Sequence, residues 1–121
     1  MNQELELEVN QLHAEFCAGL ADPKRLLILY SLNEGPRNVG ELSSLLNTSQ
    51  PAISRHLKVL RERGMVSATR LGPNVEYRLT DHRLVEALDL LRSILADRLR
   101  TQADLAKNLY PGEETETKES E

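Results

Sequence analysis

The sequence has very few aromatic residues and a single cysteine, and each scarcity excludes a class of structure. With no tryptophan, one phenylalanine and three tyrosines among 121 residues, the core has to be aliphatic, and the abundant leucine favours helices over an aromatic-rich sandwich. Cys17 has no second cysteine with which to form an intrachain disulfide, and one cysteine is far from a zinc-ligand set. We therefore expect neither a disulfide scaffold nor a cysteine zinc site.

Signals for membrane insertion, secretion and catalysis are missing as well. The chain has no run of about 18 uncharged apolar residues, which excludes a membrane span. Its acidic first stretch, MNQELELEVN, argues against a signal peptide, so we expect a cytoplasmic protein. There is no glycine-rich phosphate loop and no grouping of a nucleophile with histidine and an acid. We therefore expect no enzyme activity and no cofactor.

Charge is distributed unevenly along the chain, whose net charge is −4. Residues 1–22 carry five acids and no lysine or arginine, residues 55–83 carry seven basic residues against three acidic ones, and residues 109–121 carry five acids and one lysine. A basic middle between acidic ends is compatible with a surface that faces nucleic acid, because local charge matters more than the total. The length fits one domain, which we place at residues 1–108, followed by an acidic disordered tail at 109–121.

The stretch from Ser49 to Gly64 has the pattern of an amphipathic helix with a polar, basic face. Its apolar residues recur at helical spacing and are Ile53, Leu57 and Leu60. Thr48 and Ser49 are candidate N-caps, and Pro51 suits the first turn, where a missing N–H costs nothing. Gly64 can adopt the left-handed conformation that ends a helix.

Two helices are predicted directly before this stretch. The first runs from Lys24 to about Asn33, with Asp22 as its cap and Pro23 in its first turn. Its expected core residues are Leu26, Leu27, Ile28, Leu29 and Leu32. The second covers residues 39–46, and residues 47–49 form the tight connection into the basic helix. Two short helices joined in this way match the helix-turn-helix motif.

The hydrophobic period changes after the basic helix. Residues 65–71 and 75–79 predict a β-hairpin, or wing, with its turn at residues 72–74. Thr80 and Asp81 are expected to cap a long last helix, residues 81–108. Residues 4–19 predict an amphipathic first helix. The fold class is therefore mainly α with a small β-hairpin, a winged helix-turn-helix.

Three segments, in this order and spacing, make the chain resemble the arsenic-repressor (ArsR/SmtB) family of bacterial winged-helix transcriptional repressors. They are LADPKRLLILYSL, SQPAISRHLKVLRERGMV and VEYRLTD, and the resemblance covers roughly residues 20–97. It implies a homodimer, held by the first and last helices, that docks two recognition helices into successive major grooves of a pseudo-palindromic operator. The residues agree, because both end helices carry apolar stripes that a two-fold dimer would bury. The expected interface residues are Leu5, Val9, Leu12, Phe16, Leu84, Leu88, Leu91 and Leu95.

Where the resemblance places base-reading residues, this chain has side chains suited to the task. Glutamine can bond adenine bidentately and arginine guanine, whereas lysine and residues at a helix N-terminus meet phosphates. A hairpin tip carrying arginine fits a narrow minor groove. The expected DNA contacts are Thr48, Ser49, Gln50, Ser54, Arg55, His56, Lys58, Arg70 and Asn74. His56 has the alternative of turning toward the wing. Arg78 of the hairpin is a further, less favoured candidate contact, with the alternative of facing the domain body.

The metal sites that the resemblance implies are both incomplete in this chain. The paired cysteines of the third helix are replaced by Asn38 and Gly40, and the site on the last helix keeps Asp81 but has Arg83, Ile94 and Asp97 at its other positions. Arginine and isoleucine cannot ligate zinc, so no metal is expected at either place. The chain is then a sensor of another signal or a repressor controlled by its own level.

Two alternatives stay open from the sequence. His13 and Cys17, four residues apart, share a helix face and could form an unorthodox thiol or metal site with Asp97 or Asp104 of a partner; the simpler interpretation is a buried Cys17 and a surface His13. A winged helix used as a protein-interaction module is the competing class of function. It predicts an exposed apolar patch on the surface of residues 50–63.

Overall fold

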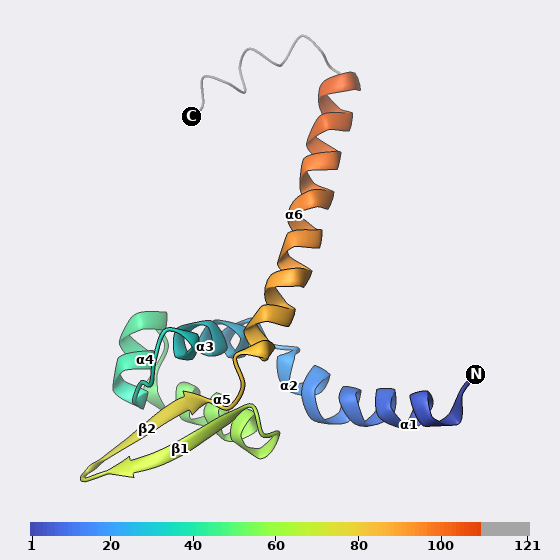
Figure 1. Cartoon of the computed structure of the whole chain (residues 1–121). Helices are drawn as coiled ribbons and strands as arrows, with labels where there is room; N and C mark the ends of the chain where they lie inside the picture. The colour runs from blue at the N-terminus through green and yellow to red at the C-terminus, as the bar shows by residue number, and fades with distance from the viewer. Residues whose placement is uncertain (110–121) are drawn as a thin grey trace. The chain divides into compact units, whose positions relative to one another are not determined.

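The computed structural model describes residues 1–109 of the chain. It comprises two compact units, Met1–Val85 and the part that begins at Glu86, and Figure 1 shows the order of their elements. None of the helices in the described part is long and apolar enough to cross a membrane.

The first unit begins with three consecutive helical segments. They are α1 (Gln3–Leu12), the π-helical turn η1 (His13–Cys17) and α2 (Ala18–Leu20). The Asn2 side chain caps the start by accepting the Glu4 N–H at 2.8 Å. The helix predicted over residues 4–19 is confirmed in extent, but the sequence did not indicate that one of its turns is π-helical.

Three helices follow, each with a polar N-cap, and the sequence offered the caps of the first and third. They are α3 (Pro23–Asn33), α4 (Val39–Leu46) and α5 (Gln50–Glu62). Asp22 caps α3 and Ser49 caps α5, with a proline in the first turn of each, while Asn38 and Glu41 form a reciprocal capping box on α4. The turn between α4 and α5 passes through Asn47 at φ 50°, and α5 is followed by Gly64 at φ 75°. The predicted helix-turn-helix is confirmed.

The core of this unit is aliphatic and is supplied mainly by α3, α5 and the start of the hairpin. Its most deeply buried residues are Ile28, Leu29, Leu32, Leu42, Ile53, Leu57, Leu60 and Met65. Leu27 was expected among them, but its side chain is 47% exposed, and that expectation is wrong. Four consecutive residues, such as Leu26 to Leu29, cannot all face one side of a helix, and Leu27 lies on the outward side.

The hairpin consists of β1 (Val66–Leu71) and β2 (Asn74–Leu79), paired antiparallel. Leu71 pairs with Asn74, so the turn is shorter than predicted and Asn74 belongs to the strand. β1 contacts α5, and β2 contacts α3 and α4. Arg37, in the connection before α4, exchanges two backbone hydrogen bonds with Tyr77 at 2.8 and 3.0 Å, which fixes the hairpin to the helical body. The fold is a mainly α winged helix-turn-helix, as predicted.

The last element, α6 (Arg83–Leu109), has 27 residues and is about 40 Å long at 1.5 Å per residue. Asp81 caps it by accepting the Arg83 N–H at 2.9 Å. Thr80, which was expected to share this role, instead donates its hydroxyl to the carbonyl of Gly64 at 2.8 Å. The predicted boundary of the folded domain at residue 108 lies near the end of α6, and the predicted disordered tail lies outside the described residues except for Leu109.

Candidate nucleic-acid interface

The two faces of α5 differ completely in their surroundings. Ile53, Leu57 and Leu60 are almost fully buried against the core of the first unit. The side chains on the other face are exposed and polar or basic, and they are Gln50, Ser54, Arg55, Lys58 and Arg61. Because the buried face fixes the rotation of the helix, these polar side chains all point away from the protein.

The turn that leads into α5 holds Thr48 and Ser49 in different ways. The Thr48 hydroxyl donates to the Leu46 carbonyl at 3.0 Å, and the Thr48 carbonyl accepts the Ser43 hydroxyl at 2.5 Å, so Thr48 is half-buried and engaged within the turn. Ser49 is exposed and accepts the Ala52 N–H at 3.3 Å. The start of α5 therefore presents Ser49 and Gln50 rather than Thr48 to solvent.

His56 is the one predicted contact on α5 that is half-buried. Its Nδ1 lies 3.5 Å from the Arg25 guanidinium of α3, so the ring is turned toward α3 and not toward the wing. Asp22 lies in the same corner of the structure. Partial burial by itself raises the pKa of the Asp22 carboxyl, but the N–H groups of Lys24 and Arg25 and the positive charges of His56 and Arg25 hold that pKa below its ordinary value.

The hairpin carries the other predicted contacts near its tip. Arg70 and Asn74 are both exposed. Arg78 is exposed as well, and its guanidinium pairs with Glu76 at 3.3 Å. The strand register puts Arg78 on the side opposite the buried Val66 and Leu79, so it faces away from the domain body.

The acidic residues of this region neutralise only part of its positive charge. Glu76 pairs with Arg78 and Asp81 with Arg83, whereas four exposed cations form no ion pair within residues 1–109. These cations are Arg55, Lys58, Arg61 and Arg70. Three of them project from the exposed face of α5 and one from the hairpin, which is the distribution expected of a phosphate-binding surface.

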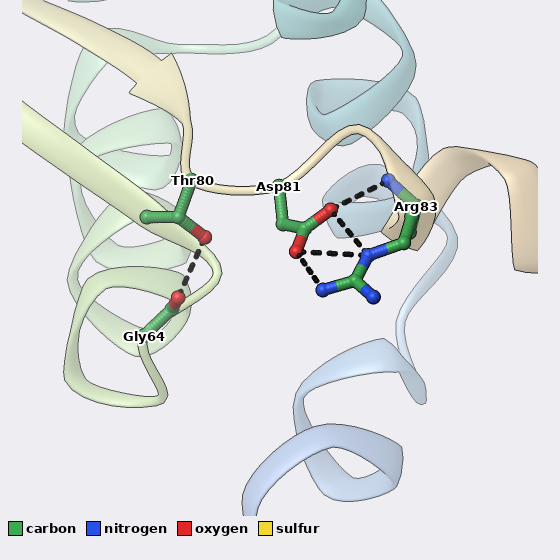
Figure 2. Close-up of polar contacts among 4 residues, drawn as sticks. All are labelled: Gly64, Thr80, Asp81 and Arg83. Atoms are coloured by element: carbon green, nitrogen blue, oxygen red, sulfur yellow. Dashed lines mark hydrogen bonds and ion pairs between the residues drawn. The ribbon is translucent and has the colours of Figure 1, made fainter.

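The positions at which the resemblance implies metal ions do not fit one. Figure 2 shows Asp81 engaged by Arg83, whose Nε lies 3.1 Å from both carboxylate oxygens and whose Nη2 lies 2.7 Å from Oδ2. At the other position, Asn38 and Glu41 are used by the capping box of α4. Within residues 1–109 no group of three or more histidine, cysteine or acidic side chains could hold a metal ion. The Arg83 guanidinium thus binds the Asp81 carboxylate oxygens that a metal ion would need as ligands.

The contact between Asp81 and Arg83 predicts a specific dependence of stability on pH. The Arg83 guanidinium and N–H lower the pKa of Asp81 from 3.8 to about 2, so the contact stabilises the folded state above about pH 4 and is lost as the pH falls toward 2. The difference in free energy of unfolding between wild type and Asp81→Asn, from urea titrations, should stay constant between pH 8 and 5 and vanish near pH 2. A change in this difference around pH 6 to 7 would contradict the assignment.

Cys17 and His13 both lie in the π-helical turn η1, and both are exposed. The surface position of His13 is as predicted. The expected burial of Cys17 is wrong for the single chain, because Cys17 faces outward from its turn instead of joining the aliphatic core.

The apolar residues predicted for a dimer interface are largely uncovered in the single chain. Five of them are exposed by about half or more, namely Leu5, Val9, Leu12, Leu91 and Leu95. Phe16 and Leu84 are half-buried, and Leu88 is only 8% exposed. Leu90, Ile94 and Leu99 of α6 are exposed too, so the uncovered apolar surface of this helix is broader than the predicted stripe.

Two arginines that the sequence did not single out hold the helical segments of the first unit together. Arg25 donates to the Gly19 carbonyl at 2.6 Å, and Arg63 donates to the Ala14 carbonyl. Because both acceptors are backbone carbonyls, no residue type in the sequence marks the partner of either arginine.

Comparisons with known proteins agree with this geometry. Residues 22–68, from the cap of α3 into β1, match the arsR family of bacterial regulatory proteins. The chain is 34% identical over 92 residues to the biofilm growth-associated repressor of Xylella fastidiosa, covering 76% of this chain and 80% of that protein. It is 42% identical over 77 residues to the transcriptional repressor SmtB of Mycobacterium tuberculosis, covering 64% of this chain but only 57% of that repressor's length.

A solved structure shows the same fold. The homodimeric winged helix-turn-helix DNA-binding domain Mb0332 of Mycobacterium bovis superposes with a TM-score of 0.70, covering 84% of this chain and 93% of that one, at 24% identity. At that identity the likeness establishes the winged helix-turn-helix fold.

Proposed function

Because the chain belongs to the ArsR family of bacterial regulatory proteins, we propose that it is a homodimeric transcriptional repressor that binds a specific duplex operator. The observation that carries this proposal is the contrast between the two faces of α5. One face is locked into the core by three apolar residues, and the other presents amide, hydroxyl and guanidinium groups. A helix seated in this way can enter a major groove with its base-reading side chains pre-oriented.

The proposed division of roles follows from side-chain chemistry and exposure. Gln50, Ser54 and Arg55 would read base edges, while Ser49 and Lys58 would contact phosphates. Arg70 and Asn74 at the hairpin tip would reach the adjacent backbone or minor groove. Thr48 and His56, which are half-buried and engaged within the protein, would contribute less contact than their position in the motif predicts.

The proposed dimer would cover the exposed leucines of α1 and α6 together with Val9 of α1. A monomer would leave the apolar stripe of each helix in water, and exposed apolar surface of that kind marks an interface. Two-fold symmetry would place two copies of α5 about 34 Å apart, one helical turn of DNA. The operator would then be a pseudo-palindrome, and binding it would occlude a promoter in the bacterial cytoplasm.

The release signal would not be a metal at either of the two familiar positions, because Arg83 holds Asp81 and the capping box holds Asn38. Relatives of the chain are transcriptional regulators, and none of the site geometry requires catalysis. A signal other than metal, or control through the repressor's own concentration, fits these residues.

A protein-interaction module is the competing proposal, and the surface of α5 disfavours it. Such a module should display large exposed apolar side chains between residues 50 and 63. Throughout that range, all of it described by the structure, every exposed side chain is polar, charged or proline, and Val59 is half-buried.

The test of this proposal is replacement of the arginine at the centre of the exposed face. Arg55→Ala should weaken binding to the operator by about 1–3 kcal/mol and relax base preference at the contacted position, because a bidentate contact to guanine would be lost. The operator can be obtained by selecting with wild-type protein from random-sequence duplexes, and the affinity measured by fluorescence anisotropy.

Arg98→Ala, which removes the same charge from α6, serves as the control and should leave base preference unchanged. The wild-type affinity itself should fall steeply with added salt, because lysine and arginine displace counterions condensed on DNA. A wild-type protein that selects no sequence, or binds it no better than random duplex, would refute the repressor proposal.

A further inference from the structure

We infer that Arg63, at the C-terminal end of α5, is a positioning residue that fixes the angle between the recognition helix and the N-terminal dimerisation helix. The inference rests on the proposed function, because it concerns how a dimer presents two recognition helices at one spacing. It assigns no DNA contact to Arg63. The support comes from the backbone of η1, from the packing at Gly19 and from a second arginine nearby.

The π-helical turn η1 makes one backbone carbonyl available for Arg63. In an α-helix the N–H of Ala18 would donate to the carbonyl of Ala14, four residues back. Here it donates to the carbonyl of His13, five residues back. Ala18 therefore does not use the Ala14 carbonyl, which accepts a hydrogen bond from Nη1 of Arg63, 49 residues away in the sequence. The π turn thus accompanies a hydrogen bond that connects the N-terminal helical segments to the end of α5.

Gly19 shows that the Arg63 side chain is closely fitted against the same helix. A Cβ added at Gly19 would lie 2.8 Å from Cδ of Arg63 and 2.5 Å from Cε of Met65, closer than real atoms approach. Gly19 is itself buried. Because Gly19 has no side chain, the Arg63 side chain can pack against this position and reach from the end of α5 to η1.

Arg25 of α3 strengthens the same junction from the other side. Its guanidinium donates to the carbonyl of Gly19 at 2.6 Å and to that of Ala18 at 3.5 Å, which are carbonyls near the end of the N-terminal helix. The same guanidinium lies 3.5 Å from His56 of α5. Arg25 thus binds the carbonyls of Ala18 and Gly19 and also contacts the recognition helix through His56. Together with Arg63, it connects the end of the N-terminal helical segments to α5.

This junction has a direct consequence for a dimer joined through its N-terminal helices. The distance between two copies of α5 depends on the angle at which each leaves the dimer interface. Arg63 fixes that angle through a planar guanidinium with several donors, which holds its partner more rigidly than the single ammonium of a lysine. Loosening the contact should let the two recognition helices drift out of register with successive major grooves.

The experiment compares Arg63→Ala and Arg63→Lys with Arg100→Ala, a control that removes the same charge from α6, outside the proposed DNA-binding surface, and should behave as wild type does. The probes are a duplex selected by the wild-type protein, the same duplex with one base pair inserted at its centre, and a random duplex. Both Arg63 variants should lose between about 2-fold and 30-fold in preference for the selected duplex, the range typical of residues that couple two sites without touching the ligand. They should also discriminate less against the altered spacing, and their salt dependence should match that of wild type.

A different pattern would overturn the inference. If Arg63 contacted a phosphate, Arg63→Ala would lower the salt slope by about one and Arg63→Lys would bind as wild type does. A wild-type preference for the correct spacing in both variants would also contradict it. Failure of the wild-type protein to select any duplex would refute the proposed function instead. In that case amide hydrogen exchange tests the role of Arg63. Arg63→Ala should accelerate the exchange of amides 18–20 and leave the exchange of the α4 amides unchanged. If amides 18–20 exchange at the same rate in Arg63→Ala as in wild type, the proposed junction is refuted.

Discussion

Leu95→Glu is expected to convert the dimer to a monomer and to weaken operator binding by about 10²- to 10⁴-fold, the gain that joining two binding sites provides. Leu95 lies in the apolar stripe of α6 and is 55% exposed in the single chain. In a two-fold dimer the substitution would bring two glutamates to one apolar interface, where each charge has to be removed from water without a partner. Sedimentation equilibrium measures the assembly state, and fluorescence anisotropy measures binding to the selected operator.

Ser93→Glu is the matched control, because it adds the same charge two residues away on the opposite side of α6. Its assembly state and operator affinity should remain those of wild type. Circular dichroism should show the same helix content in both variants, since glutamate is a good helix former. A Leu95→Glu protein that stays dimeric would mean that the stripe of α6 does not form the interface.

The starts and ends of the helices could be predicted because short sequence signals determine them. Asp22 and Ser49 cap their helices through hydrogen bonds to backbone N–H groups two or three residues ahead, and Gly64 adopts the left-handed conformation that ends α5. The exposed face of α5 was predicted for a similar reason, since the spacing of its three leucine and isoleucine residues sets which face is buried. Such signals act over a few residues and need no tertiary information.

Features that depend on contacts between distant segments could not be predicted. The sequence around His13 gives no indication of a π turn, because the acceptor freed there is used by Arg63, from the far end of α5. Thr80 looked like a helix cap by residue type, yet its hydroxyl is taken by the carbonyl of Gly64. His56 matched the pattern of a DNA contact, but a neighbouring helix places Arg25 against its ring. In each case the partner is a group that the local sequence does not identify.

Leu57→Ala is expected to lower the free energy of unfolding by about 2–5 kcal/mol, the usual loss for a leucine truncated in a core. Leu57 is only 1% exposed and lies between Ile53 and Leu60 on the inner face of α5. Truncation removes its contacts and leaves a cavity that the surrounding helices can fill only in part. Since total stabilities of such domains are about 5–15 kcal/mol, the midpoint of thermal unfolding should fall markedly. Urea titration measures the change.

The neighbouring Lys58→Ala should have the reverse set of effects, and the comparison tests the assignment of the two faces. Lys58 is exposed, so its truncation should change stability by no more than about 0.5 kcal/mol while lowering the salt slope of DNA binding by about one. Leu57→Ala, measured at a temperature where it is folded, should keep the wild-type salt slope because it removes no charge. If Lys58→Ala instead destabilised the fold and left the salt slope intact, α5 would present its other face to DNA. The rotation of one helix thus decides both results, since the same three apolar residues that stabilise the core determine which side chains reach the groove.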